Sequence, residues 1–338
     1  MPAATGRSPG GKLSRRWLDW IATNKVLGAP DAELVAELER RGVPSELAAA
    51  CVARPDPEAL LAVARRQRAL VEKYEAQLDD YETLRRLAPG AGGIERRRDL
   101  PRDEFLRLYY SAGRPVVIEG LLEGAAAMRW SPEYLRERFG DELVEVQTGR
   151  RLKPIWDVFL KGKTEQMPLR EYVDMVSAAG ETNEFYMTGN DGFLSRDGVR
   201  ELWDDLDFAR EYLVGIENVR SANLWYGPRG AVSPLHRDRV NVLKAQLVGR
   251  KRILMVPSSQ LHRVYNERSF YSEVDVEAPD LEPFPRFRGV PVLDLVLHPG
   301  ECLFIPIGWW HHVRSLDVTM SLTFTNFAFP NRFRGSVG

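Results

Sequence analysis

The stretch SPLHRDRVNVLKAQLVGRKRILMVP, residues 233–257, joins a polar H-x-D pair to two strand-like runs. NVLKAQLVG (241–249) and RKRILMVP (250–257) are rich in apolar residues, and each ends at Gly or Pro, which is typical of a β-strand. Similar runs lie on both sides of this stretch, namely SANLWYG (221–227), VLDLVLHPG (292–300), ECLFIPIG (301–308) and SLTFTNFAF (321–329). Many short strands separated by turn residues predict an antiparallel sandwich or barrel.

The sequence before this strand-rich part has a helical pattern. Apolar residues recur at helical spacing between about residues 17 and 87, and PGAGG (89–93) is a loop signal. We therefore predict a disordered tail (1–12), a helical N-terminal region (13–93) and a main domain (94–338). The helical region is interpreted as a packing or dimerising extension, in preference to a module that binds a partner or substrate.

Composition sets limits on the function. The 338 residues include 47 basic and 48 acidic side chains, for a net charge of −1, so we expect neither nucleic-acid binding nor attraction to an anionic membrane. Only two cysteines occur, Cys51 and Cys302, which argues against a disulfide framework. The basic, Gly/Pro/Ser-rich N-terminus precedes no apolar run of the kind found in signal peptides. These observations predict a cytoplasmic protein.

The chain has only five histidines, and those in two short segments are well placed for metal binding. His236 and Asp238 are two residues apart, so in an extended chain both side chains lie on the same face. WWHHV (309–313) follows a predicted strand and is the candidate source of a third ligand. Two imidazoles and one carboxylate leave open positions on a metal, as in non-haem Fe(II) oxygenases. Taken alone, the H-x-D pair is a weak signal, and an isolated histidine is more often an ordinary hydrogen-bonded residue.

The blocks SPLHRD, QLVGRKRILMVP and PGECLFIPIGWWHHVRSL together resemble the JmjC oxygenases. They are most similar to the cupin-like branch that includes the asparaginyl hydroxylase known as factor inhibiting HIF, and the resemblance spans about residues 97–329. It implies a double-stranded β-helix, mainly β with flanking helices, that uses Fe(II), 2-oxoglutarate and O2. The family's iron ligands fall on His236, Asp238 and His311, because the third ligand in the family directly follows a tryptophan.

The same resemblance implies the contacts of the cosubstrate. Lys251 matches the lysine that holds the distal carboxylate of 2-oxoglutarate. Ser233 and Tyr186 match residues that hydrogen-bond the cosubstrate, and Asn326 falls where an asparagine often lines the pocket. Without the resemblance, Lys251 would read as a solvated lysine at a strand end.

Three positions depart from the family pattern. Arg237 replaces the usual aromatic residue between the first two ligands, and Arg239 follows the aspartate. Val242 stands where an asparagine is usual, with Asn241 one place early, and a shift of one residue turns the amide to the other face of a strand. Our hypothesis is that Arg237 or Arg239 binds an acidic group on the substrate, and the alternative is that both face solvent.

The activity that the resemblance implies is hydroxylation of a side chain in a peptide, protein or amino acid, coupled to conversion of 2-oxoglutarate into succinate. N-demethylation by the same oxidation is the alternative within the family. Enzymes of this family often dimerise through helices outside the barrel, so the resemblance also implies that residues 57–87 could serve as the helix of a homodimer. Two other classes stay open: a cupin-like protein that binds a metal or small ligand without turnover, and a scaffold whose function lies in the N-terminal helices.

Overall fold

The computed structural model describes residues 12–151, 163–215, 222–267 and 270–333. The chain divides into two compact units, Met1–Asp80 and Tyr81–Gly338, and each is described by itself. Among the described residues, no helix is long and apolar enough to cross a membrane. The two cysteines are free, and Cys302 is buried.

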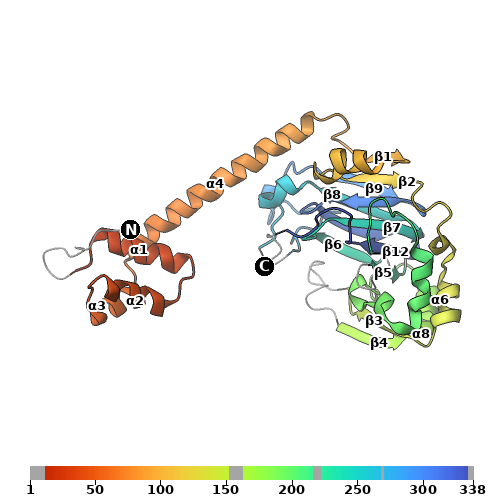
Figure 1. Cartoon of the computed structure of the whole chain (residues 1–338), viewed down its shortest axis with the longest axis horizontal. Coiled ribbons are helices and arrows are strands. Elements are labelled where there is room, and N and C mark those ends of the chain that lie inside the picture. The colour runs from red at the N-terminus through yellow and green to blue at the C-terminus, as the bar shows by residue number, and fades with distance from the viewer. Residues whose placement is uncertain (1–11, 152–162, 216–221, 268–269, 334–338) are drawn as a thin grey trace. The chain divides into compact units, whose positions relative to one another are not determined.

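The first unit is helical, as the sequence predicts. It contains α1 (Arg15–Val26), α2 (Asp31–Arg40), α3 (Ser45–Ala53) and most of α4 (Pro57–Leu87) (Figure 1). The first three helices pack their apolar faces together around a small core of their own, which includes Trp17, Ile21, Leu34, Leu38 and Val52. Helix α4 leaves Leu70, Val71 and Tyr74 exposed.

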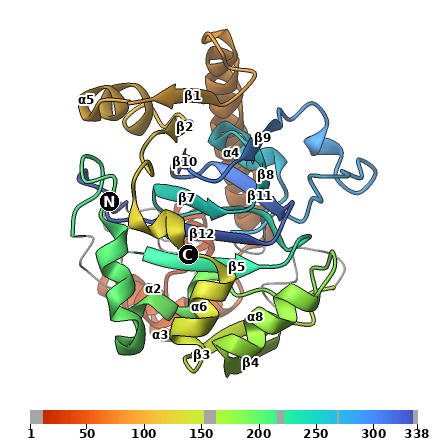
Figure 2. The ribbon, with the colours of Figure 1, turned by 90° about the vertical axis from the view of Figure 1, so that its right-hand side faces the viewer.

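The second unit is built on two β-sheets, and the double-stranded β-helix predicted above is confirmed. One sheet has the order β1-β2-β10-β7-β12-β5 (Figure 2), and the other has the order β6-β11-β8-β9. All neighbouring strands are antiparallel except β1 and β2. The strands of the first sheet are β1 (Glu95–Arg98), β2 (Val116–Glu119), β5 (Ala222–Gly227), β7 (Val242–Val248), β10 (Cys302–Ile305) and β12 (Thr319–Phe324). Those of the second are β6 (Val232–Arg237), β8 (Lys251–Val256), β9 (Leu293–Leu297) and β11 (Trp310–Ser315).

Apolar side chains from both sheets meet in one core cluster, which shows that the sheets face each other. Val242 and Leu303 come from the six-stranded sheet, and Ile253, Met255 and Leu295 come from the four-stranded sheet. The cluster fills one part of the space between the sheets, and the polar cavity described below occupies another part.

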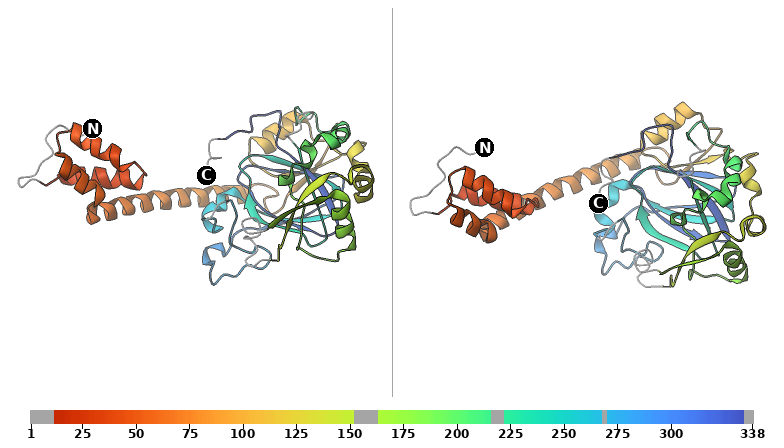
Figure 3. Two further views of the ribbon diagram at one scale, coloured as in Figure 1. Left: turned by 90° about the horizontal axis from the view of Figure 1, so that it is seen from below. Right: turned by 60° about the horizontal axis from the view of Figure 1, so that its bottom comes forward.

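Helices cover the other face of the six-stranded sheet, where the largest core cluster lies (Figure 3). They are α5 (Arg102–Phe105), the π-helical turn η1 (Leu106–Tyr110), α6 (Pro132–Phe139) and α8 (Leu169–Ala178), with the 3₁₀ turns η2 (Ala126–Arg129), η4 (Gly189–Asp191), η5 (Phe193–Ser195) and η6 (Asp197–Leu206). A third sheet pairs β3 (Leu143–Thr148) with β4 (Lys163–Pro168). The turns η7 (Ser258–Arg263) and η8 (Pro285–Phe287) lie in the long connection from β8 to β9.

The turn between β7 and β8 depends on a glycine. Gly249 has a φ of +64°, and a Cβ atom at this position would collide with the carbonyl oxygen of Val318. Only glycine adopts this conformation without steric cost. The tight turn starts β8 at Lys251, a residue that the resemblance assigns to the cosubstrate.

Candidate metal and cosubstrate site

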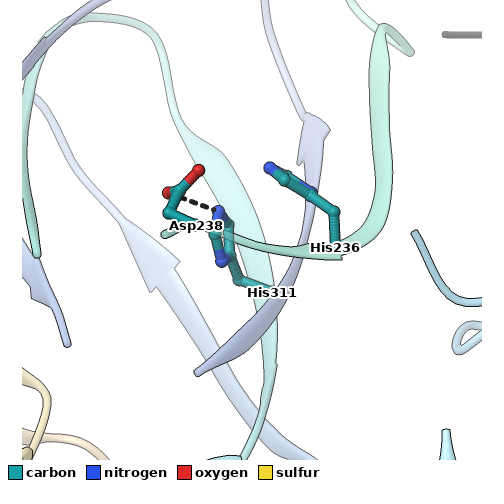
Figure 4. Close-up of side chains that lie close together, drawn as sticks. All are labelled: His236, Asp238 and His311. Carbon is teal, nitrogen blue, oxygen red and sulfur yellow. Dashed lines mark ion pairs between the residues drawn. The ribbon is translucent and has the colours of Figure 1, made fainter. Parts of the chain in front are cut away.

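Strand pairing brings the three predicted metal ligands together. β6 and β11 are antiparallel neighbours in which His236 lies opposite His311, and Asp238 follows immediately after the last residue of β6. One donor atom from each side chain lies within 4.8 Å of the others. His311 Nε2 is 3.6 Å from Asp238 Oδ2, and the two imidazole centroids are 4.1 Å apart. Figure 4 shows the three side chains around a common point.

Backbone carbonyls orient both imidazoles. His236 Nδ1 donates to the carbonyl of Pro234 at 2.7 Å, and His311 Nδ1 donates to that of Trp309 at 3.2 Å. A proton held on Nδ1 leaves Nε2 unprotonated, which is the form that binds a metal. Burial lowers the pKa of His236 and also that of His311, which favours the neutral rings further.

The charge of this cluster fits a divalent cation. Burial raises the pKa of Asp238, so ionisation of its carboxyl group is unfavourable in this setting without a cation. Among the described residues, the only ion-pair partner within 4 Å of this carboxylate is His311, a ring that burial keeps neutral. A divalent ion would compensate the carboxylate, and two nitrogen donors with one oxygen donor suit iron.

The cluster lies in a cavity of about 490 Å³ between the two sheets. The six-stranded sheet contributes Asn223, Trp225, Val242, Lys244, Ile305 and Thr323, and the four-stranded sheet contributes Ser233, His236, His311 and Val313. Tyr186, Gly189, Asn190, Asp238, Arg239, Val240, Tyr271 and Thr325 complete the lining. A cavity of this size with a few convergent polar groups is typical of small-ligand sites.

Two of the predicted cosubstrate residues are joined by a hydrogen bond. The Lys251 ammonium group, which is fully buried, donates to the Tyr186 hydroxyl at 3.1 Å and to the Ser321 hydroxyl at 2.9 Å. The Tyr186 ring lies against Gly227 in β5, where any Cβ atom would overlap it. Ser233 is buried and lines the cavity. Lys251 itself is not among the described lining residues, so it meets the cavity through Tyr186.

Asn326 lies elsewhere. Its amide nitrogen donates to the carbonyl of Val214, and the lining residues nearest to it in sequence are Thr323 and Thr325. The structure therefore does not bring Asn326 to the cavity wall with the other predicted contacts.

The one-residue shift between Asn241 and Val242 has the consequence expected from strand geometry. Val242 lines the cavity. Asn241 is buried, and its side-chain oxygen accepts a hydrogen bond from the backbone of Ile307 at 2.7 Å. Asparagine at position 241 thus supports the barrel wall, and no amide faces the ligand from position 242.

The two unusual arginines differ in position. Arg239 lines the cavity, with its guanidinium 4.5 Å from the centre of the Phe270 ring. Arg237 lies over Phe270 and Trp310 at 5.6 and 5.9 Å, outside the described lining. Of the two, Arg239 is therefore placed to meet a ligand.

Sequence reasoning missed three residues in or near the site. Lys244 and Tyr271 line the cavity. Arg150 is fully buried, and its guanidinium lies 5.3 Å from the Tyr186 ring centre. Lys244 shares a face of β7 with Val242, but a lysine in a strand-like run does not by itself indicate burial, and Tyr271 and Arg150 lie in irregular segments.

Comparisons with known proteins agree with this geometry. A family model described as a cupin-like domain matches residues 101–331. The chain is 32% identical over 230 residues to a Xenopus tropicalis protein named lysine-specific demethylase 8, covering 66% of this chain and 50% of that protein. It is 32% identical over 240 residues to lysine-specific demethylase JMJ30 of Arabidopsis thaliana, covering 68% of this chain and 54% of that protein. It is 26% identical over 264 residues to human HSPB1-associated protein 1, covering 70% of this chain and 53% of that protein.

The chain spans about half the length of these curated relatives, so the likeness concerns the domain that they share. Its match to the family model covers most of the chain and includes every residue of the His236–Asp238–His311 cluster. The chain belongs to the cupin-like family of JmjC-type domains, the family of the Fe(II)- and 2-oxoglutarate-dependent oxygenases.

Proposed function

We propose that this protein is an Fe(II)- and 2-oxoglutarate-dependent oxygenase that hydroxylates a side chain of a protein or peptide. The observation that carries the proposal is the cluster of His236, Asp238 and His311 in the same cavity that the buried Lys251–Tyr186 pair adjoins. A chelating oxoacid needs both features, one for each end of the molecule. When bound, iron with 2-oxoglutarate and O2 supplies oxidation of a C–H bond coupled to decarboxylation of the cosubstrate to succinate.

The residues of the chain would divide the remaining tasks. His236, Asp238 and His311 would hold the iron on one face, and Lys251 with Tyr186 would fix the distal carboxylate of 2-oxoglutarate. Ser233 would offer a further hydrogen bond from β6. The apolar side chains Val242, Ile305 and Val313 would limit the water that reaches the reacting atoms.

Demethylation is the second candidate, because two of the relatives are named lysine-specific demethylases. The charge of the lining favours hydroxylation of an uncharged or acidic side chain. Arg239 is basic, and Asp238, which the metal would occupy, is the only carboxylate among the described lining residues. A methylated ammonium group would be repelled by Arg239 and would meet no further carboxylate among those residues.

The test is turnover of 2-oxoglutarate by the full chain with Fe(II) and O2, in the presence of a peptide library. We expect succinate and a peptide that gains one oxygen atom, with both products absent in Asp238→Ala. Release of formaldehyde with loss of a methyl group would establish demethylation instead. If the wild type forms no succinate with any peptide although it binds iron and 2-oxoglutarate, the oxygenase proposal is wrong and a binding protein is the better description.

A further inference from the structure

A second buried lysine, Lys244, lies close to Lys251 and lines the cavity itself, and the family resemblance does not explain it. Lys244 lies in the middle of β7 and is 5% exposed, while Lys251 at the start of β8 is fully buried. Both ammonium groups donate to the same hydroxyl, that of Ser321 on β12, at 3.1 Å from Lys244 and 2.9 Å from Lys251. Two lysine amino groups therefore converge on one hydroxyl beside the cavity.

In the described part of the chain, the carboxylate that acts on Lys244 is Asp238, which lies beyond ion-pair distance of it and which the metal would occupy. Neither lysine has a carboxylate within ion-pair distance among those residues, and their other neighbours are the Tyr186 hydroxyl and the faces of aromatic rings. The ring centre of Trp225 lies 5.5 Å from the Lys244 nitrogen. A buried ammonium group without a counter-ion is strongly unfavourable, and a second one close by adds repulsion. Burial lowers the pKa of both lysines, so the pair tends to lose a proton when no anion is near, and an anion bound between the two amino groups would restore both charges.

The cavity indicates where that anion lies. Lys244 shares its strand face with Val242, and both line the space that the metal ligands also line. A carboxylate has two oxygens that together accept about four hydrogen bonds. Lys244, Lys251, Ser321 and Tyr186 offer enough donors to satisfy both oxygens at once.

We propose that Lys244 and Lys251 together clamp the distal carboxylate of 2-oxoglutarate, with the Ser321 hydroxyl between them. This inference rests on the proposed function and adds a specificity-determining residue to it. With two cations at its closed end, the pocket selects oxoacids that carry a second carboxylate and rejects those that end in a methyl group.

The experiment is calorimetric titration of the full chain, loaded with Mn(II) in place of iron, with 2-oxoglutarate and with 2-oxopentanoate, which lacks the distal carboxylate. Lys244→Met is expected to weaken 2-oxoglutarate binding about tenfold to a hundredfold, the range for loss of one charge-assisted hydrogen bond. The same variant should change 2-oxopentanoate binding less than about twofold, because that ligand never meets the ammonium group. Lys244→Arg, which keeps the charge, should retain part of the preference for 2-oxoglutarate.

Lys163→Met is the matched control, since it removes another lysine of the second unit, one that is exposed in β4 and lies outside the cavity lining. Its 2-oxoglutarate affinity should stay within about threefold of the wild type. The clamp is wrong if Lys244→Met binds 2-oxoglutarate at least as well as the wild type while Lys251→Met binds it poorly. That result would leave the proposed function intact. Equal weakening of both ligands by Lys244→Met would also overturn it. If the wild type with Mn(II) does not bind 2-oxoglutarate at all, the proposed function fails along with the clamp.

Discussion

Single residues in this cavity carry charges that the protein alone does not balance. Asp238 faces two neutral imidazoles, and Lys244 and Lys251 share one serine hydroxyl. Each arrangement is unfavourable in an empty pocket and becomes favourable when a divalent cation or a carboxylate binds. The site is thus built for its ligands at the expense of the stability of the free protein.

Lys244→Met should therefore stabilise the metal-free protein at pH 7. Burial lowers the pKa of Lys244 to about 8, against about 10.4 in the unfolded chain, so the protonated form costs the folded state up to about 3 kcal/mol at neutral pH. Above pH 8 the folded protein releases this proton before the unfolded chain does, and the wild type becomes relatively more stable. Urea unfolding at pH 7 and pH 9.5 should show the advantage of the variant shrinking by about 1–2 kcal/mol. An advantage that is the same at both pH values would contradict this account.

The cluster of predicted metal ligands could be found from sequence because its signal is local. His236 and Asp238 are two residues apart, and His311 directly follows Trp310 in a recognisable block. Lys244 was missed because a lysine within a strand-like run gives no sign of burial, which only the packing of the second sheet creates. Asn326 was expected at the cavity wall, but a hydrogen bond to the distant Val214 holds its side chain elsewhere.

Among the elements, the pairing of β6 with β11 decides the site. The runs between residues 221 and 329 predicted β5, β7, β8, β9, β10 and β12, because each run is apolar and ends at a turn residue, but no such run marked β6 or β11. The order of the strands in the sheets could not be predicted, since it depends on contacts between segments far apart in sequence. His311 lies on a strand of its own, β11, beside β6, whereas the sequence indicated only that it follows a strand.

The register of β7 leads to a second prediction. Asn241→Ala removes the oxygen that accepts the Ile307 amide and leaves that donor unpaired. The free energy of unfolding should fall by about 1–3 kcal/mol, while the Kd for 2-oxoglutarate stays unchanged, because this side chain lies outside the cavity lining. Chemical denaturation and calorimetry on the same sample measure both quantities. Weaker cosubstrate binding without a loss of stability would show that the register is wrong.

At the scale of the whole molecule, the chain has two units with separate cores. The division falls after Asp80, and the family match begins at residue 101. Glu82, near the end of α4, belongs to the second unit: its buried carboxylate accepts hydrogen bonds from Arg85, Arg86 and Ser259. Burial opposes ionisation of this carboxyl group, but these bonds lower the pKa of Glu82 to about 2. A homodimer through residues 57–87 stays a prediction.

A fragment that begins at Tyr81 should therefore bind metal and 2-oxoglutarate as the full chain does, within about twofold in Kd. A fragment that begins at residue 94, the boundary predicted from the sequence, lacks Glu82 and its bond to Ser259. We expect its Tm to be lower than that of the longer fragment. Thermal unfolding of both fragments beside the full chain tests this, and equal Tm values would show that the end of α4 adds nothing to the barrel.

The most direct test of the central claim is an anaerobic titration of the metal-free full chain with Fe(II) and then 2-oxoglutarate, followed by visible absorption. We expect the weak metal-to-ligand charge-transfer band of an iron-bound oxoacid in the wild type, no band in His236→Ala, and a band in Lys251→Ala that requires more 2-oxoglutarate. No band in the wild type despite stoichiometric bound iron would contradict the claim that this cavity holds both iron and 2-oxoglutarate.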